Sequence, residues 1–257
     1  MATELLYLDD FDVLTAPATV ISVSVLEDGR LDVVLDRTCF YPRGGGQDWD
    51  TGIIRAGDAA SRVEEVRLDE HGVVHHLGAG EAPGVAVSEK PVGGETVSEG
   101  AAVVLEVDSD RRAVNTRLHS AGHIVDLAVE RLGLPWVPGK GAHYPHMSFV
   151  EYSGDVPGEV EEIRQRIEQE VARIIGEGSR NEIRFMPVAD MGKYCRHVPD
   201  NIPTNKPARI VLYNQTFGVP CGGTHVRDVA EVGTLSIPKI KSKKGVTKVS
   251  YAVEGVS

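Results

Sequence analysis

Two pairs of metal-type side chains constrain the fold of this 257-residue chain more than any other feature. His119 and His123 are separated by three residues, and the same spacing separates Cys221 and His225 far along the chain. Imidazole and thiolate together form the ligand set that a borderline-soft cation such as zinc prefers. The two pairs can meet only through tertiary structure. The sequence therefore predicts a metal site built in a cleft between distant segments.

The first pair lies in a predicted amphipathic helix over residues 109–132. His119 and His123 lie one helical turn apart and project from the same side of it, beside the apolar stripe. Asp108 or Ser109 is suited to cap the start of the helix, and Gly133 suits its end. The apolar stripe consists of Val114, Leu118, Ala121, Val125, Ala128 and Leu132.

The second pair follows a predicted strand at 208–213 and belongs to a turn. Gly222 and Gly223 allow a sharp turn and a close approach of the backbone to whatever Cys221 and His225 hold. No carboxylate near either pair stands out as a general base, so none is assigned. A zinc peptidase has the same histidine spacing, but Ser120 stands where that motif requires a glutamate.

The order of predicted elements indicates an α+β chain with two domains. Residues 1–105 are predicted to form a small β-barrel-like domain from short, β-branched strands at 20–25, 31–35, 63–68, 73–77 and 101–107. Residues 106–257 are predicted to form an α+β domain that carries the metal cleft. Besides the first helix, this domain is expected to contain a helix at 157–177 and strands at 147–152, 183–187, 208–213, 232–237 and 246–253. Residues 78–100 and 133–146 are predicted to be loops.

Composition places further limits on function. The chain is 41% apolar and 25% charged, as expected of a globular protein. Its three cysteines do not indicate a disulfide framework, and no signal-peptide or membrane-spanning pattern is present, so we expect a cytoplasmic protein with no membrane partner. A net charge of −11 is unfavourable for a general nucleic-acid binder. A local lysine cluster with Lys241, Lys243 and Lys244 is either a solvated loop or a phosphate contact.

A glycine-rich motif follows Phe40-Tyr41-Pro42-Arg43. Gly44, Gly45 and Gly46 would lose much backbone entropy in a packed strand, so they favour a loop that approaches another surface closely. The alternative is a flexible hairpin tip. No Gly-Lys-Ser/Thr sequence closes the motif, so it is not a nucleotide-hydrolase phosphate loop, and no nucleotide cofactor is expected.

Three motifs occur in an order that resembles a known family. Phe40-Tyr41-Pro42 with Gly44-Gly45-Gly46-Gln47 and Asp50-Thr51-Gly52 comes first, Arg117-x-His119-x-x-x-His123 second, and Cys221-Gly222-Gly223-Thr224-His225-Val226 third. Together they resemble the AlaX family of freestanding alanyl-tRNA editing proteins, in its medium-sized form, and the related editing region of alanyl-tRNA synthetases. The resemblance covers nearly the whole chain, but Thr247-Lys248-Val249 departs from the paired arginines common in that family.

The resemblance implies a trans-acting hydrolase that deacylates mischarged tRNA(Ala), usually carrying serine and sometimes glycine. It implies one zinc ion held by His119, His123, Cys221 and His225, with no catalytic group assigned beyond a water molecule on the metal. The glycine loop and Gln47 are expected beside the cleft, and Lys241, Lys243 and Lys244 are the predicted tRNA contacts. No pattern indicates an oligomeric state.

Selectivity for serine over alanine requires a polar partner for the serine hydroxyl, because the rejected substrate is the smaller one. Thr38 is the predicted partner, against the alternative of an exposed strand threonine. His143 and His146 are secondary candidates to line the cleft. Two further alternatives remain: a deacylase of another mischarged tRNA, as in threonyl-tRNA proofreading, and a non-catalytic RNA-binding module stabilised by zinc.

Overall fold

The computed structural model describes residues 2–79 and 97–256, and the chain divides into two compact units. The first unit comprises residues 1–44 and 48–113, and the second comprises residues 45–47 and 114–257. The short segment Gly45–Gln47 therefore belongs to the second unit although the surrounding sequence belongs to the first. Most of the loop predicted at 78–100 lies outside the described residues. The predicted domain boundary after residue 105 stays a prediction.

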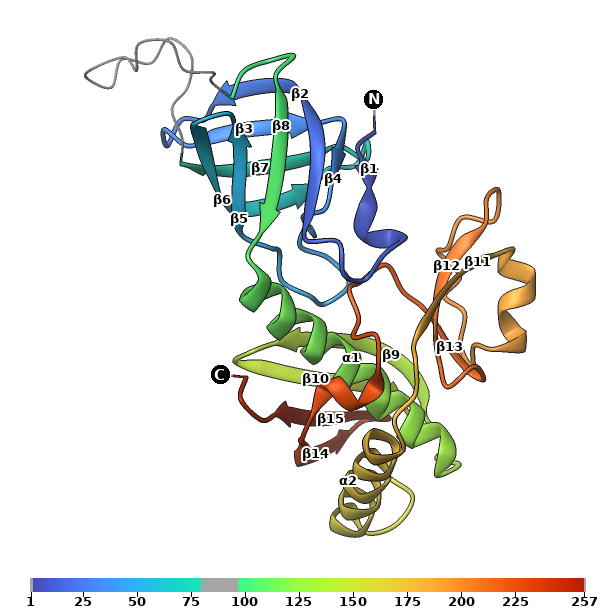
Figure 1. The fold of residues 1–257 in the computed structure, drawn as a ribbon. Helices are drawn as coiled ribbons and strands as arrows, with labels where there is room; N and C mark the ends of the chain where they lie inside the picture. Colours follow the sequence, from blue (N-terminus) through green and yellow to red (C-terminus); the bar gives the residue numbers. More distant parts are fainter. Residues whose placement is uncertain (1, 80–96, 257) are drawn as a thin grey trace. The chain divides into compact units, whose positions relative to one another are not determined.

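The first unit is built on a closed antiparallel barrel, which confirms the predicted β-barrel architecture (Figure 1). Burial alternates along the strands, as in β3, where Leu31, Val33 and Leu35 face the core and the residues between them do not. A short parallel pair joins β1 (Glu4–Leu5) to β4 (Arg37–Thr38). The barrel order is β2 (Thr15–Val25), β3 (Leu31–Leu35), β7 (Val74–Ala79), β6 (Ala59–Leu68), β5 (Gly52–Ala56) and β8 (Ala102–Val107).

A buried ion pair ties the first turn of α1 (Ser109–Arg131) to the segment after β4 within the first unit. The Arg112 guanidinium donates to the Asp50 carboxylate at 2.5 Å, and also to the Cys39 carbonyl at 2.6 Å. The Tyr41 backbone N–H donates to the same carboxylate at 2.7 Å. Both side chains are almost fully buried, so each depends on the other for its hydrogen bonds.

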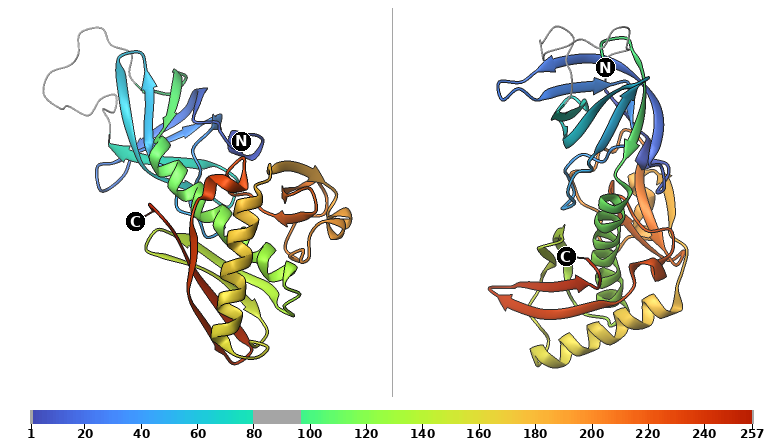
Figure 2. Two further views of the ribbon diagram at one scale, coloured as in Figure 1. Left: turned by 60° about the horizontal axis from the view of Figure 1, so that its bottom comes forward. Right: turned by 60° about the vertical axis from the view of Figure 1, so that its left-hand side comes forward.

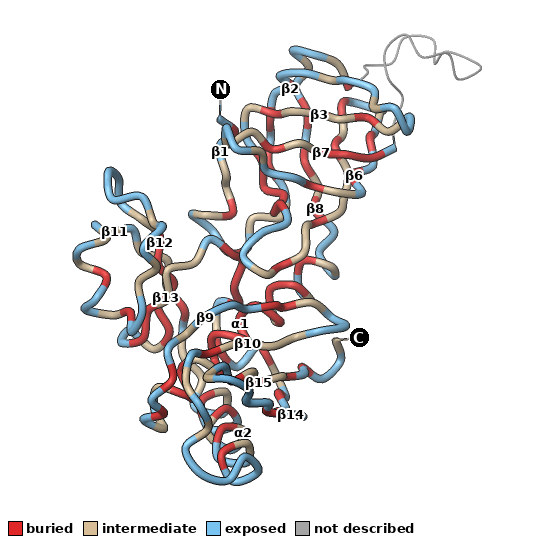
Figure 3. Tube along the Cα trace, turned by 180° about the vertical axis from the view of Figure 1, so that it is seen from behind, coloured by how far each residue is buried: buried red, intermediate tan, exposed pale blue. Residues whose placement is uncertain are grey.

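The second unit packs helices against a four-stranded antiparallel sheet with the order β14-β15-β10-β9. The predicted ligand helix is present as α1. Figure 3 shows that buried residues occur along the length of this helix. Asp108 caps its start by accepting the backbone N–H groups of Asp110 and Arg111. Helix α2 (Val160–Glu177) packs along β14 (Figure 2). The strands are β9 (Val137–Tyr144), β10 (Met147–Ser153), β14 (Leu235–Lys243) and β15 (Val246–Val253).

A second, three-stranded antiparallel sheet in this unit positions the cysteine turn. It consists of β11 (Glu182–Met186), β12 (Ala208–Tyr213) and β13 (Phe217–Pro220). Cys221 follows β13 directly, so the turn starts from a strand that is paired to the buried β12. Short 3-10 helices occur at Leu6–Leu8, Val188–Lys193 and Val229–Val232.

Two loop predictions are wrong. Residues 133–146 contain strand β9, whose glycines and proline conceal the strand pattern. Because β9 lies at the edge of its sheet, Pro138 is tolerated there. Lys241 and Lys243 also lie in a strand rather than a loop, since β14 runs to Lys243 and the predicted strand at 232–237 ends too early, whereas Lys244 lies in the turn that follows. Strand β5 was not predicted, because its five residues show no clear alternation.

Replacing Asp50 by alanine should lower the free energy of unfolding by about 3 kcal/mol, because Arg112 would remain buried without its carboxylate. Urea denaturation followed by circular dichroism measures the change. Arg55→Ala is the control, since the Arg55–Glu106 pair is exposed and should contribute little. Equal stability of the two variants would contradict the structural role of the buried pair.

Candidate metal centre

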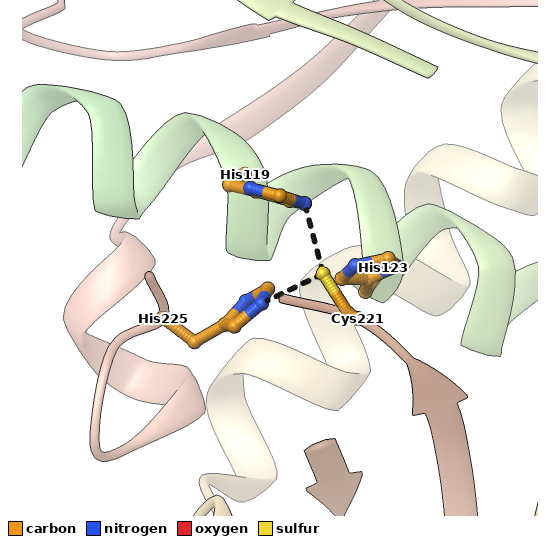
Figure 4. A group of neighbouring side chains, drawn as sticks. All are labelled: His119, His123, Cys221 and His225. Atoms are coloured by element: carbon orange, nitrogen blue, oxygen red, sulfur yellow. Dashed lines mark hydrogen bonds between the residues drawn. The ribbon is translucent and has the colours of Figure 1, made fainter. Parts of the chain in front are cut away.

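The structure brings the four predicted ligands together. One donor atom from each of His119, His123, Cys221 and His225 lies within 4.8 Å of the others (Figure 4). All four belong to the second unit. The three histidines are buried, and the cysteine is partly exposed. This group can hold a metal ion, and its mixture of imidazole and thiolate suits a borderline-soft divalent cation.

The turn that carries Cys221 is held in place from two sides. Arg209 on β12 donates to the carbonyls of Cys221 and Gly223, at 2.6 and 3.0 Å. A β-carbon on Gly223 would lie 2.2 Å from the His119 ring, so a side chain at this position cannot coexist with that histidine as placed. The turn residue must therefore be glycine if the helix and the turn are to approach this closely.

Each histidine ring is oriented through its Nδ1 atom. The Nδ1–H of His119 donates to the Gln47 side-chain carbonyl at 2.7 Å. The Nδ1 of His123 lies 3.3 Å from the Asp126 carboxylate, and that of His225 lies 3.0 Å from the Tyr213 hydroxyl. Such outer contacts are typical of metal-binding histidines, because they fix the ring and leave Nε2 for the metal.

The Nε2 atoms and the sulfur face one another. The Cys221 Sγ lies 3.3 Å from Nε2 of His119 and 3.3 Å from Nε2 of His225. These separations match the edge of about 3.5 Å expected for a tetrahedral zinc site with nitrogen and sulfur ligands. His123 Nε2 is buried and has no hydrogen-bond partner among the described residues. A buried nitrogen without a partner is costly, and a bound metal ion would remove that cost.

The charge states favour metal binding. Burial, together with the surrounding histidines, lowers the pKa of His119 well below its ordinary value, and burial with the His123 charge does the same for His225. Burial also opposes ionisation of Cys221, but the neighbouring His123 outweighs it and lowers the thiol pKa. Burial of His123 is outweighed by Asp126 and Cys221, which raise its pKa to about 9. The Cys221 thiol thus ionises more readily than usual, His119 and His225 stay neutral, and His123 carries a proton that a metal would displace.

The glycine-rich segment reaches the same cluster. The Gln47 side chain is fully buried, accepts the Thr224 N–H at 3.2 Å and donates to the Thr224 hydroxyl at 2.9 Å. Gly46 has a φ of +77°, and its carbonyl accepts the His143 N–H at 2.8 Å. A β-carbon on Gly46 would lie 2.4 Å from the Gly141 carbonyl. The segment therefore makes the predicted close approach, rather than being a flexible hairpin tip.

A cavity of about 450 Å³ opens beside the cluster within the second unit. His119, His123 and Cys221 line it, and so does Gly45. The secondary candidate His143 also lines the cavity, whereas His146 lies outside the described lining. Burial and the charge on His123 lower the pKa of His143 to about 3. Further lining comes from Asp126, Lys140, Val150, Glu151, Arg196 and Phe217.

The remaining predicted residues occupy other places. Thr38 lies buried in the first unit, where its hydroxyl contacts His76 Nε2 at 2.8 Å and accepts the Phe40 N–H at 3.0 Å. The alternative of an exposed strand threonine is therefore wrong, and these contacts lend no support to a role in binding serine. Gly44 also belongs to the first unit, and its carbonyl accepts the Tyr41 hydroxyl. Lys241, Lys243 and Lys244 are exposed at the end of β14.

Sequence reasoning missed the residues that orient the ligands. No carboxylate was assigned as a general base, and that stays a prediction; what was missed is that Asp126 contacts His123 and also accepts the Tyr152 hydroxyl at 2.6 Å. Its spacing of three residues from His123 on a helix was a usable signal. Arg209 and Tyr213 offered none, since their contacts depend on tertiary structure.

Comparison with known proteins agrees with this geometry. A profile of the family described as tRNA synthetases class II (A) matches residues 13–110. The alanyl-tRNA editing protein AlaX-L of Pyrococcus horikoshii is 29% identical over 233 residues, which is 88% of this chain and 52% of that protein. The chain is thus similar to an alanyl-tRNA editing protein of the AlaX type. The chain is also similar to alanine–tRNA ligases.

The ligase similarity extends over nearly the whole chain. The alanine–tRNA ligase of Methanopyrus kandleri is 32% identical over 97% of this chain, and that of Archaeoglobus fulgidus is 29% identical over 98% of it. The chain spans about half the length of AlaX-L and about a quarter of each ligase. Within residues 2–79 and 97–256, no helix has the length and apolar character needed to cross a membrane.

Replacing Cys221 by alanine should reduce bound zinc to well below one ion per chain after zinc loading and gel filtration, because it removes the sulfur that two imidazoles face. Elemental analysis measures the metal content. Cys195→Ala is the matched control, since Cys195 is a buried cysteine of the hydrophobic cluster under β12. Equal zinc content in both variants would reject Cys221 as a ligand.

Proposed function

We propose that this protein hydrolyses the ester bond of mischarged tRNA(Ala), with serine as the main amino acid and glycine as a second. The observation that carries this proposal is the cavity beside the four-residue cluster, in a chain related to an alanyl-tRNA editing protein. The cavity has the size of a small-molecule site, which suits the aminoacylated end of a tRNA. The proposed cofactor is one zinc ion held by His119, His123, Cys221 and His225.

In this proposal, different residues around the site have different roles. When bound, zinc would supply Lewis acidity for ester hydrolysis. Gln47, Asp126 and Tyr213 orient the three imidazoles, which keeps the ligand atoms directed at one point. Phe217 and Val150 contribute apolar surface to the cavity wall. An aminoacyl ester is already activated, so this arrangement requires no strong nucleophile.

Local positive charge supports a tRNA partner despite the net charge of −11. Lys140 and Arg196 line the cavity, where a phosphate of the terminal nucleotides would pass. Lys248 on β15 pairs with the cavity residue Glu151 at 2.9 Å and stands opposite Lys241 on β14. The lysines of β14 thus form a basic strip that β15 separates from β10, the nearest strand with residues that line the cavity. We propose that this strip contacts the tRNA backbone.

The peptidase alternative loses support from the position of Ser120. Its side chain is fully buried, and its hydroxyl accepts the Val226 N–H at 3.0 Å, so it fastens the cysteine turn to α1. A general base at this helical position would have to face the metal and the substrate instead. Deacylation of another mischarged tRNA and tRNA binding without hydrolysis remain as alternatives, and both are outcomes of the following assay.

The purified protein should release serine from Ser-tRNA(Ala) and leave Ala-tRNA(Ala) intact. His123→Ala should lower kcat/KM by about a hundredfold or more, because several kcal/mol of Lewis-acid stabilisation are lost. Release of labelled amino acid from the tRNA measures both activities. His146→Ala is the control, since this exposed histidine lies outside the described cavity lining.

Three results would contradict the proposal. Hydrolysis of a different mischarged tRNA in preference to Ser-tRNA(Ala) would move the protein to another editing class. Binding of tRNA without any hydrolysis would favour the non-catalytic module. Full activity of His123→Ala in a metal-free preparation would remove the metal from the reaction.

Replacing Lys241, Lys243 and Lys244 together by alanine should weaken tRNA binding and flatten the dependence of log Kd on log salt concentration by up to about two units. Each phosphate contact releases counterions, so losing contacts lowers the slope. Filter binding across a salt series measures it. Lys193→Ala is a control from another surface, where the lysine pairs with Asp190. An unchanged slope in the triple variant would mean that these lysines are solvated and make no phosphate contact.

A further inference from the structure

His143 is a fourth histidine beside the cluster that is not one of the grouped ligands. It lies on β9, is buried, and stacks on the His119 ring with 4.5 Å between ring centroids and 16° between planes. Its ring centroid is 6.3 Å from that of His123. Any group bound at the metal centre and projecting into the cavity would therefore meet this ring within the reach of a small side chain.

Hydrogen bonding fixes which nitrogen of His143 carries the proton. The Tyr251 hydroxyl donates its hydrogen to the Leu118 carbonyl at 2.9 Å, and a carbonyl can only accept. The same hydroxyl lies 2.5 Å from His143 Nδ1. Because the hydroxyl hydrogen is already used, Nδ1–H must be the donor in this second contact. The neutral ring then has its lone pair on Nε2.

His143 is part of the cavity wall. The Nδ1 edge is occupied by Tyr251 and one ring face is covered by His119, so His143 meets the cavity with the remainder of its ring. Nε2 has no hydrogen-bond partner among the described residues, and unlike His123 Nε2 it is not sealed from the cavity. A β-carbon on Gly141 would lie 2.6 Å from Nε2, so the absence of a side chain there leaves the nitrogen open.

We propose that His143 Nε2 accepts the hydrogen bond of the serine hydroxyl and thereby selects serine over alanine. This inference rests on the proposed function and replaces Thr38 as the specificity residue. A fixed acceptor suits this task, because alanine would leave it unpaired in a confined site. The two carboxylates of the lining are already engaged, Asp126 by His123 and Tyr152, and Glu151 by Lys248.

The test compares two adenosine probes that carry serine or alanine through a non-hydrolysable amide in place of the ester. They differ by one hydroxyl group, and isothermal titration calorimetry measures the Kd of each on the zinc-loaded protein. The wild type should bind the seryl probe at least about tenfold more tightly than the alanyl probe. In His143→Phe, which keeps a stacked ring without nitrogen, the two Kd values should agree to within about twofold.

Two further variants keep the test decisive. Gly141→Ala keeps the imidazole but puts a β-carbon 2.6 Å from the present position of Nε2, so the ring must move or Nε2 is blocked. This variant should therefore also remove the preference, even if His143→Phe fails to fold. His146→Phe makes the same histidine replacement three residues away, on an exposed site that stacks on Tyr144, and should keep the wild-type preference. Zinc content, measured by elemental analysis, should be unchanged in all three variants.

A persistent seryl preference in His143→Phe or Gly141→Ala with zinc retained would overturn the role of His143. Hydrolysis assays separate this outcome from failure of the proposed function. If the wild type deacylates neither Ser-tRNA(Ala) nor Gly-tRNA(Ala) and binds neither probe, the proposed function itself is wrong. If it deacylates both, His143→Phe should reduce kcat/KM for the serine substrate by at least about tenfold and leave the glycine substrate unchanged, because glycine has no hydroxyl.

Discussion

The approach of the Cys221 sulfur to the imidazoles of α1 is the interaction on which the second unit depends. A cysteine sulfur and three imidazoles are costly to bury together unless a hydrogen-bond donor or a metal ion interacts with their lone pairs. The chain nevertheless brings Sγ within 3.3 Å of His119 Nε2. It holds that contact with Arg209 behind the turn and with glycine at position 223, where any side chain would strike the ring. The local architecture therefore gathers four side chains that can hold a metal ion.

The orientation of each imidazole comes from a different part of the unit. Gln47 enters on the glycine-rich segment, Asp126 stands one turn along α1, and Tyr213 ends β12. These partners hold the Nδ1 atoms, so the Nε2 atoms are left for a metal. The same logic extends to His143, whose Nδ1 is held by Tyr251 while its Nε2 meets the cavity. In the proposed account, one side of the site holds the metal and the other offers a neutral acceptor to the substrate.

The sequence predicted the parts of this arrangement that are encoded locally. The spacing of His119 and His123 and the apolar stripe of α1 are helical signals, and alternation in the barrel strands is a strand signal. Strand β9 was missed because glycine and proline are tolerated in an edge strand. Asp126 was overlooked although its spacing was readable. Tyr251 and Arg209 could not be predicted, since both act through contacts between segments with no local pattern.

The central claim is that one zinc ion is bound by three imidazoles and one thiolate. X-ray absorption at the zinc K-edge tests it most directly, because sulfur and nitrogen ligands give distinct bond lengths of about 2.3 and about 2.0 Å. The account predicts one sulfur and three nitrogens at the wild-type protein, and loss of the sulfur shell in any zinc that Cys221→Ala retains. A zinc site without sulfur in the wild type, or an unaltered sulfur shell in Cys221→Ala, would contradict it.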